Sequence, residues 1–237
     1  MRDEASNWLD ASLSWTGNFL DELFVYDDQS SDDSMNVALK HTPFVVRRSD
    51  DETSFMEHEG KFRQNAWKHM TEALDPDPSD WILTFDADEF LVGGFDQKIR
   101  DRLERLIVIA QDVNRDCVNI ARPEVWQHDI KLLVRTDGFW MGASPRLANW
   151  KPGSKFKNKK IGCGSLPEMY VDPLSTVHLV SLLHLGYSTP EDRQRHYSRY
   201  MGLKNHGHSQ KHIDSILSTP ELMEFEGPAP KIWRGKR

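Results

Sequence analysis

The sequence predicts an α/β fold with a mostly parallel central sheet, mixed toward its end, flanked by helices. Short apolar runs alternate with helical patterns over the first half of the chain, which is typical of parallel strands joined by helices. One apolar run, residues 81–86, ends abruptly in acidic residues, and open α/β sheets bind ligands at the carboxyl ends of their strands. The apolar runs after residue 117 lie closer together, which favours mixed pairing there.

The first elements are predicted from the spacing of apolar residues and from the residues that end each pattern. Apolar positions in 5–16 recur at helical spacing. A short strand at 23–26 leads into the polar cluster 27–34, which indicates a loop that caps the next helix. The elements expected next are a helix at 35–40, a strand at 44–46, a helix at 57–74 that Asp75-Pro76 breaks, the strand at 81–86 and a helix at 96–110.

The second half of the chain is predicted to hold more strands and to end in helices. Thr189 is a suitable helix cap and Pro190 a suitable first helical residue, so a helix is expected from there to about residue 203. The other elements expected are strands at 117–121, 131–135, 145–148 and 177–184, and short helices near 209–217 and 220–225.

Composition limits the class of protein. The 237 residues suffice for one sizeable domain, and a charged fraction of 28% with 38% hydrophobic residues suits a soluble globular protein. There is no apolar run near 18 residues and the first residues do not resemble a signal peptide, so no membrane span is expected. Two cysteines in no metal or redox spacing favour a cytoplasmic location. The net charge of -7 argues against nucleic acid as a partner.

The segment WILTFDADEF carries the strongest functional signal. Asp86 and Asp88 stand one residue apart at the end of an apolar strand, where both could meet one cation. Mg²⁺ and Mn²⁺ prefer oxygen ligands and often keep positions open for phosphate oxygens. The alternative is that these acids are ordinary turn or helix-start residues. The sequence holds no GxxxxGK[ST] loop and no GxGxxG after a strand, which removes the commonest nucleotide-binding motifs.

A basic run at 151–160 could serve either of two purposes. It could be a solvated loop, or a flap that meets an anionic ligand such as a diphosphate. The high count of eight tryptophans fits core packing as well as platforms for sugars.

The order of the motifs resembles glycosyltransferases of the GT-A fold, and is most similar to the bacterial family 2 in its DxDEF branch. The matching segments are VYDDQSSDD, FRQNAW, DADEF and LLHLGYSTPEDRQRHYSRY, and the resemblance covers residues 2–203. It implies the nucleotide-diphospho-sugar transferase fold with a C-terminal helical extension. It also implies metal-dependent transfer of a hexose from a nucleotide-sugar donor, a UDP- or GDP-sugar, to an acceptor hydroxyl with inversion.

The resemblance assigns donor contacts to two of these segments. Asp27 and Asp28 match the acidic strand end that contacts the base and ribose of the nucleotide. Their alternative role is to cap the next helix. Arg63 and Asn65 match the basic-Asn helix near the donor, although Arg63 could also be a solvated helix residue.

The same resemblance implies a site for Mn²⁺ or Mg²⁺. Asp88 would be the direct ligand, and Asp86 would face the ribose or a metal-bound water. Glu89 would support the site from behind. His184 matches a late histidine that completes metal or diphosphate binding, although a lone histidine that ends an apolar strand is more often a satisfied core residue.

Sugar transfer also requires a base for the acceptor hydroxyl, usually a carboxylate. The family places this base after the central sheet. Glu168 is the favoured candidate and Asp172 the next, with Glu124 and Asp137 as further candidates. The acceptor would be a glycan, a lipid-linked sugar or a protein.

The domain plan follows from the same resemblance. We expect a catalytic domain over 1-188, and C-terminal helices and a tail over 189-237 that pack on it. The family opens with an apolar strand, whereas Arg2-Asp3-Glu4 match only its last polar residues, so most of that strand is expected to be missing. The basic tail 231–237 allows at most peripheral contact with a membrane.

Two other functions stay open at this point. A nucleotidyltransferase of the same fold needs a glycine-rich basic loop after its first strand, and the sequence has none. A degenerate, non-catalytic module that binds a glycan or nucleotide is favoured by the incomplete first strand and disfavoured by the intact DADEF segment.

Overall fold

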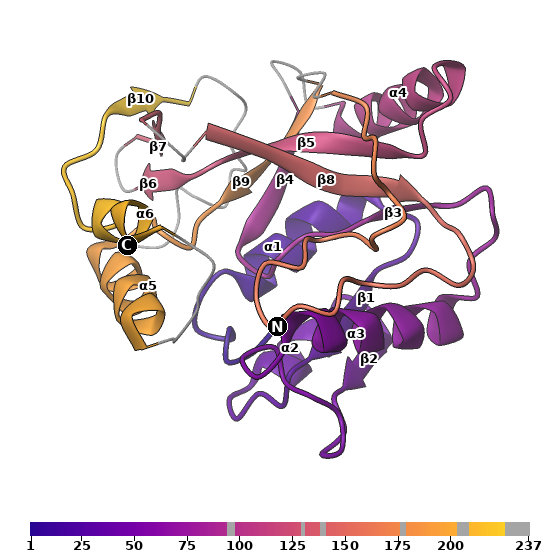
Figure 1. The fold of residues 1–237 in the computed structure, drawn as a ribbon, viewed down its shortest axis with the longest axis horizontal. Helices are drawn as coiled ribbons and strands as arrows, with labels where there is room; N and C mark the ends of the chain where they lie inside the picture. Colours follow the sequence, from indigo (N-terminus) through magenta and orange to yellow (C-terminus); the bar gives the residue numbers. More distant parts are fainter. Residues whose placement is uncertain (94–97, 129–130, 138–140, 176–178, 203–208, 226–237) are drawn as a thin grey trace.

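The computed structural model describes residues 1–93, 98–128, 131–137, 141–175, 179–202 and 209–225, and its centre is a five-stranded mixed sheet (Figure 1). The strand order is β3-β8-β5-β9-β4. The strands are β3 (Trp81–Leu83), β8 (Met141–Asn149), β5 (Cys117–Pro123), β9 (Val180–His184) and β4 (Glu89–Gly93). The predicted strands at 81–86, 117–121, 145–148 and 177–184 correspond to four of these, although 176–178 lie outside the described residues.

The pairing within this sheet corrects the expectation of a mostly parallel arrangement. In the described ladders only β5 and β9 pair in parallel, whereas β3–β8, β5–β8 and β4–β9 are antiparallel. The reason is that β8 returns between β3 and β5, and β4 follows the turn after β3 directly. Apolar periodicity gives no information on strand direction, so the sequence pattern missed this. The strands β3, β5 and β9 nevertheless run in the same direction.

The amino-terminal part contains a separate two-stranded sheet, which lies below the main sheet in Figure 1. Strand β1 (Phe24–Asp27) pairs in parallel with β2 (Phe44–Arg47), and helix α2 (Ser34–Leu39) connects them, as the sequence predicts. Helix α1 (Leu9–Thr16) ends in a short 3-10 turn (Gly17–Phe19). Leu9 and Leu13 of α1 pack against this unit, so its apolar face is buried as expected for an amphipathic helix.

Helices cover both faces of the main sheet. Leu103 and Leu106 of α4 (Ile99–Asp112) pack with Ile120 of the sheet in one core cluster. Trp67 of α3 (Glu59–Leu74) packs with Ala148 in a second cluster. The sheet is therefore sandwiched between helices, which is the layered arrangement of an α/β protein.

The basic run at 151–160 lies along the start of α3. The backbone N–H groups of Glu59 and Gly60 donate to the carbonyl oxygens of Lys160 and Lys159, at 2.8 and 2.9 Å. A Cβ at Gly60 would lie 2.1 Å from the carbonyl oxygen of Lys157, so only glycine permits this approach. The segment is thus tied to the first turn of α3 by its backbone.

The carboxyl-terminal elements pack on a third sheet, which has three strands. Helix α5 (Pro190–Gly202) begins as predicted, because the N–H of Asp192 donates to Thr189 Oγ1 at 3.0 Å. Helix α6 (Gln210–Ser215) follows, and a sheet in the order β10-β7-β6 consists of β6 (Val125–Gln127), β7 (Leu133–Arg135) and β10 (Leu222–Glu224). The helix predicted over 220–225 was wrong, because β10 pairs there with the edge of β7. None of the helices in the described ranges is long and apolar enough to cross a membrane.

Candidate functional site

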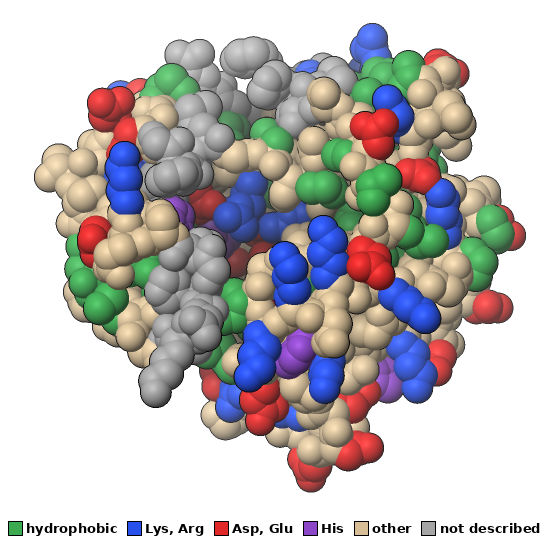
Figure 2. Space-filling model, viewed as in Figure 1, with side chains coloured by type: hydrophobic (Ala, Val, Ile, Leu, Met, Phe, Trp, Pro, Cys, Tyr) green, Lys and Arg blue, Asp and Glu red, His purple; other side chains and the backbone are tan. Residues whose placement is uncertain are grey.

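The three strands that run in the same direction carry polar groups to one edge of the sheet. The DADE turn follows β3, Glu124 follows β5, and His184 is the last residue of β9. In the ladders His184 lies opposite Glu89 of β4 and forms an isolated bridge with Glu124. Figure 2 shows a hollow in this face of the molecule, with acidic, basic and histidine side chains inside it. The carboxyl ends of these strands therefore meet, as in other α/β ligand sites.

His184 connects two carboxylates from different strands. Its Nε2 lies 3.3 Å from Asp88 Oδ2, and its Nδ1 is hydrogen-bonded to Glu124. Burial opposes protonation of the imidazole, but the facing Glu124 and Asp88 raise the pKa of His184 well above its usual range. The glutamate fixes the ring orientation and leaves Nε2 directed at Asp88, an arrangement that is usual behind metal-ligating histidines.

The ligand atoms of Asp88 and His184 are arranged to suit one divalent ion. Two neighbouring ligands about 2.1 Å from an octahedral Mg²⁺ lie about 3 Å apart, close to the separation of Asp88 Oδ2 and His184 Nε2. Gly186 leaves space beside both atoms. The described part of the chain has no group of three His, Cys, Asp or Glu side chains arranged to hold a metal. The protein would thus supply two ligands, and phosphate or water oxygens the rest.

Glu89, predicted to support the site, pairs with two arginines and accepts a backbone hydrogen bond from the DADE turn. Glu89 is fully buried, and its Oε1 lies 2.7 Å from Arg146 and 3.5 Å from Arg122. Its Oε2 accepts the backbone N–H of Asp86 at 2.8 Å, which holds the DADE turn. Burial raises the pKa of Glu89 and Asp86 adds to this rise, whereas Arg146 opposes it.

Asp86 lies at the opening of this network. Its side chain is 41% exposed, 3.6 Å from Arg146 and 4.0 Å from Arg63. Burial opposes ionisation, but Arg146 and then Arg63 hold the pKa of Asp86 below its usual range. Asp86 is therefore a carboxylate with one exposed side, available to a polar ligand.

Of the two residues predicted on helix α3 to lie near the donor, Arg63 lies at this site and Asn65 does not. Arg63 Nε lies 2.8 Å from Glu59 Oε1, and Glu59 Oε2 accepts the N–H of Gly162 at 2.6 Å. The guanidinium is thereby fixed beside Asp86. Asn65 lies two residues further on α3, about 200° around the helix axis, so it points away from Arg63.

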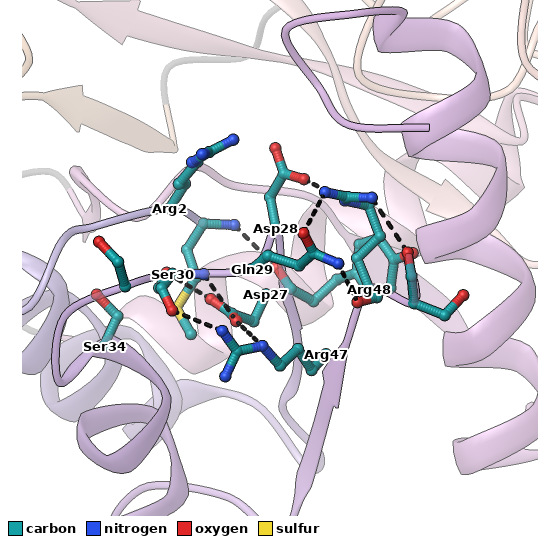
Figure 3. Close-up of polar contacts among 12 residues, drawn as sticks. Arg2, Asp27, Asp28, Gln29, Ser30, Ser34, Arg47 and Arg48 are labelled. Atoms are coloured by element: carbon teal, nitrogen blue, oxygen red, sulfur yellow. Dashed lines mark hydrogen bonds and ion pairs between the residues drawn. The ribbon is translucent and has the colours of Figure 1, made fainter. Parts of the chain in front are cut away.

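Asp27 and Asp28, predicted to contact the nucleotide, already have partners within the protein (Figure 3). Asp27 is buried and accepts the N–H and Oγ–H of Ser30 at 3.1 and 2.5 Å. Asp28 is buried too, with Arg48 Nε at 2.5 Å and the N–H of Phe55 at 3.1 Å. These bonds shape the loop after β1, and donor contacts by the two acids stay a prediction.

The first residues of the chain lie beside β1, where the resemblance expects the end of another strand. The amine of Met1 donates to the carbonyl of Tyr26, and the N–H of Asp28 donates to the carbonyl of Met1, both at 2.8 Å. The N–H of Glu4 donates to Ser34 Oγ at 2.7 Å. Residues 1–4 are thus fastened to the loop after β1, part of which Figure 3 shows.

The predicted bases do not join this cluster. Asp172 pairs with Arg115 beside Cys117, at the start of β5, whereas Arg122 lies near its end, about 17 Å away at 3.3 Å per residue. Glu168 is exposed, and its N–H donates to the carbonyl of Lys155 at 2.8 Å. The physical reason is that residues 151–170 cover α3 rather than the strand ends.

Of the two further candidates for the base, Glu124 belongs to the cluster but is already paired, and Asp137 is held by an arginine outside it. Glu124 bonds His184 and pairs with Arg122 at 2.8 Å. Asp137 pairs with Arg135 at 2.5 Å. The residues that sequence reasoning missed are Arg122 and Arg146, because a lone arginine in an apolar strand gives no signal until strand register places it beside an acid.

Comparisons with known proteins give a likeness of fold only. No family model matches the chain, and no curated protein matches its sequence. Among solved structures, the chain is similar to S. aureus TarS 1-349, with 15% sequence identity and a TM-score of 0.44. The match covers 92% of this chain and 67% of that chain. A likeness of this size carries no argument about activity, so the function is inferred from the site itself.

Proposed function

We propose that this chain is a GT-A-fold glycosyltransferase that transfers a hexose from a nucleoside diphosphate donor to an acceptor hydroxyl. The observation that supports it is the meeting of Asp88 and His184, two residues from separate strand ends, with the neighbouring Asp86 4.0 Å from Arg63. Such a site suits a diphosphate with a bound cation better than it suits a neutral ligand.

Each residue has a part in the proposed reaction. Mn²⁺ or Mg²⁺, when bound, supplies Lewis-acid stabilisation of the departing diphosphate. Asp88 and His184 hold the ion, and Glu124 orients the imidazole. Asp86 offers its exposed oxygen to the ribose, and the guanidinium of Arg63 faces the diphosphate. The transfer is proposed to proceed by one displacement that inverts the anomeric carbon: the acceptor oxygen bonds to that carbon, the bond to the diphosphate breaks, and the hydroxyl proton passes to a carboxylate base.

The test is the effect of donors on thermal unfolding, with metal and without it. UDP-, GDP-, CMP- and dTDP-sugars are each added with Mn²⁺ or with EDTA. A donor present at a hundred times its Kd adds about 2.7 kcal/mol of stability, which raises the Tm by about 5–10 °C for a chain of this size. We expect this rise with one base, in Mn²⁺ only. Donor hydrolysis then separates an enzyme from a binding module, and the absence of a Tm rise with every donor would contradict the proposal.

Gly186 provides a second test of the same site. A Cβ there would lie 2.8 Å from both Asp88 Oδ2 and His184 Nε2, so the two ligand atoms would be pushed apart. We expect Gly186→Ala to weaken Mn²⁺ binding by about 10- to 100-fold, the range found when the surroundings of metal ligands are altered. The measurement is calorimetric titration with Mn²⁺. Gly142→Ala is the matched control, because a Cβ at Gly142 meets nothing within 4 Å; equal Mn²⁺ affinity in both variants would count against the metal site.

A further inference from the structure

Helix α5 presents two different sides to the rest of the molecule. Tyr197 and Tyr200 pack against the buried cluster formed by Trp126, Tyr187 and Ile216. His196 and Arg199 project from the adjoining side, because successive helical residues are rotated by about 100°. The aromatic side therefore anchors the helix, His196 borders it, and Arg199 lies outside the aromatic cluster.

The side of α5 that carries His196 lies near His184. The ring of His196 is 4.6 Å from that of Tyr187, which in turn contacts the ring of His184 at 5.6 Å. Burial, and then the charge of His184, lower the pKa of His196 to about 4, which fits the same proximity. The helix thus borders the Asp88–His184 pair.

Arg199 and Arg63 both lie close to one aromatic ring, that of Phe55. The guanidinium carbon of Arg199 lies 5.7 Å from the centre of the Phe55 ring, and that of Arg63 lies 5.6 Å from the same ring. Two cations from helices far apart in sequence thereby share one aromatic ring. Arg63 has carboxylate partners, Glu59 and Asp86.

Arg199 differs from Arg63 in what satisfies its donors. Its Nε is buried and has no hydrogen-bond acceptor within the described ranges. A guanidinium carries five N–H donors in a planar fork, and a buried donor without an acceptor costs stability. An anion with several oxygens is the kind of ligand that would supply acceptors to such a group.

We propose that Arg199, together with Arg63, binds the diphosphate of the donor from the α5 side of the hollow. This rests on the proposed function, and it adds the carboxyl-terminal helix to the donor site. Phosphate oxygens between the two guanidinium groups would give Arg199 Nε its acceptor and offset the repulsion of the two like charges. The ring of Phe55 would form the floor beneath them.

Titration calorimetry with UDP, GDP and inorganic pyrophosphate, each with Mg²⁺, tests this proposal. We expect Arg199→Gln to weaken the binding of the diphosphate probes by about 10- to 100-fold, the value of one charge-assisted contact to phosphate. Arg199→Lys keeps the positive charge but lacks the planar fork of the guanidinium. Its affinity for the diphosphate probes should therefore lie between those of the wild type and of Arg199→Gln. Arg105→Gln is the matched control, with the same loss of charge at an exposed position of α4, and should change affinity less than about twofold.

The outcomes separate this proposal from the function on which it rests. If Arg199→Gln and Arg199→Lys bind UDP or GDP as the wild type does, Arg199 is not a diphosphate ligand, although the proposed function stands. If the wild type binds pyrophosphate through Arg199 but neither nucleotide, the anion site stands and the proposed function fails. If the wild type binds none of the three probes, both fail.

Discussion

Replacing Asp88 with asparagine should lower the rate of donor turnover by about 10³-fold, since loss of electrostatic stabilisation at a leaving group costs several kcal/mol. The substitution keeps the size of the side chain but removes the charge that faces His184 Nε2 at 3.3 Å. Glu124 still bonds the other ring nitrogen, so the imidazole keeps its orientation. The expected loss therefore reports on the cation, not on a displaced histidine.

The measurement is the initial rate of donor hydrolysis over a series of Mn²⁺ concentrations, together with the Tm rise that the donor causes. Asp112→Asn is the matched control. Asp112 is the exposed last residue of α4, and its substitution removes the same charge. A wild-type rate for Asp88→Asn at every Mn²⁺ concentration, or an undiminished Tm rise, would exclude Asp88 as a ligand. Recovery of the rate at high Mn²⁺ would instead show weakened binding with intact chemistry.

The meeting of Asp88 and His184 could be predicted because each stands at the end of an apolar strand, whereas their binding of a metal stays a proposal. Asp88 and His184 are far apart in sequence, but both follow strands that run in the same direction, so the sheet brings them to one edge. Local patterns suffice for such residues, since the polar position at the end of an apolar run is visible in the sequence itself. The helices α2, α3 and α4 are found from the sequence for the same local reason.

The supporting residues depend on contacts that no local pattern records. Arg146 reaches Glu89 because β8 lies between β3 and β5, and the register of β5 and β8 shifts between Val118 and Asn119. Both the order and the shift are long-range properties of the folded sheet. Glu168 shows the reverse case, in which a suitable carboxylate in a suitable stretch of sequence is held elsewhere by its neighbours. Residue type therefore predicts what a side chain can do, and topology decides where it can act.

Replacing Glu89 with alanine should lower the free energy of unfolding by about 3–5 kcal/mol, because it leaves buried arginine charge without its partner. Arg146 is 2% exposed and lies 2.7 Å from Glu89 Oε1, and Arg122 shares the same oxygen at 3.5 Å. The N–H of Asp86 would also lose its acceptor. Urea unfolding measures the change, with Glu104→Ala on the exposed side of α4 as the control, expected to cost less than about 1 kcal/mol.

A second substitution at this position, Glu89→Gln, separates two explanations for a buried acid behind the DADE turn. If Glu89 only balances charge, Glu89→Gln should restore little stability, because a neutral amide cannot neutralise Arg146. If the main role of Glu89 is to hold the turn, the amide oxygen of glutamine can still accept the N–H of Asp86. Glu89→Gln should then bind the donor as the wild type does, although its free energy of unfolding stays low. Wild-type stability in Glu89→Ala would contradict both, and would mean that Arg146 and Arg122 find other acceptors once the carboxylate is gone.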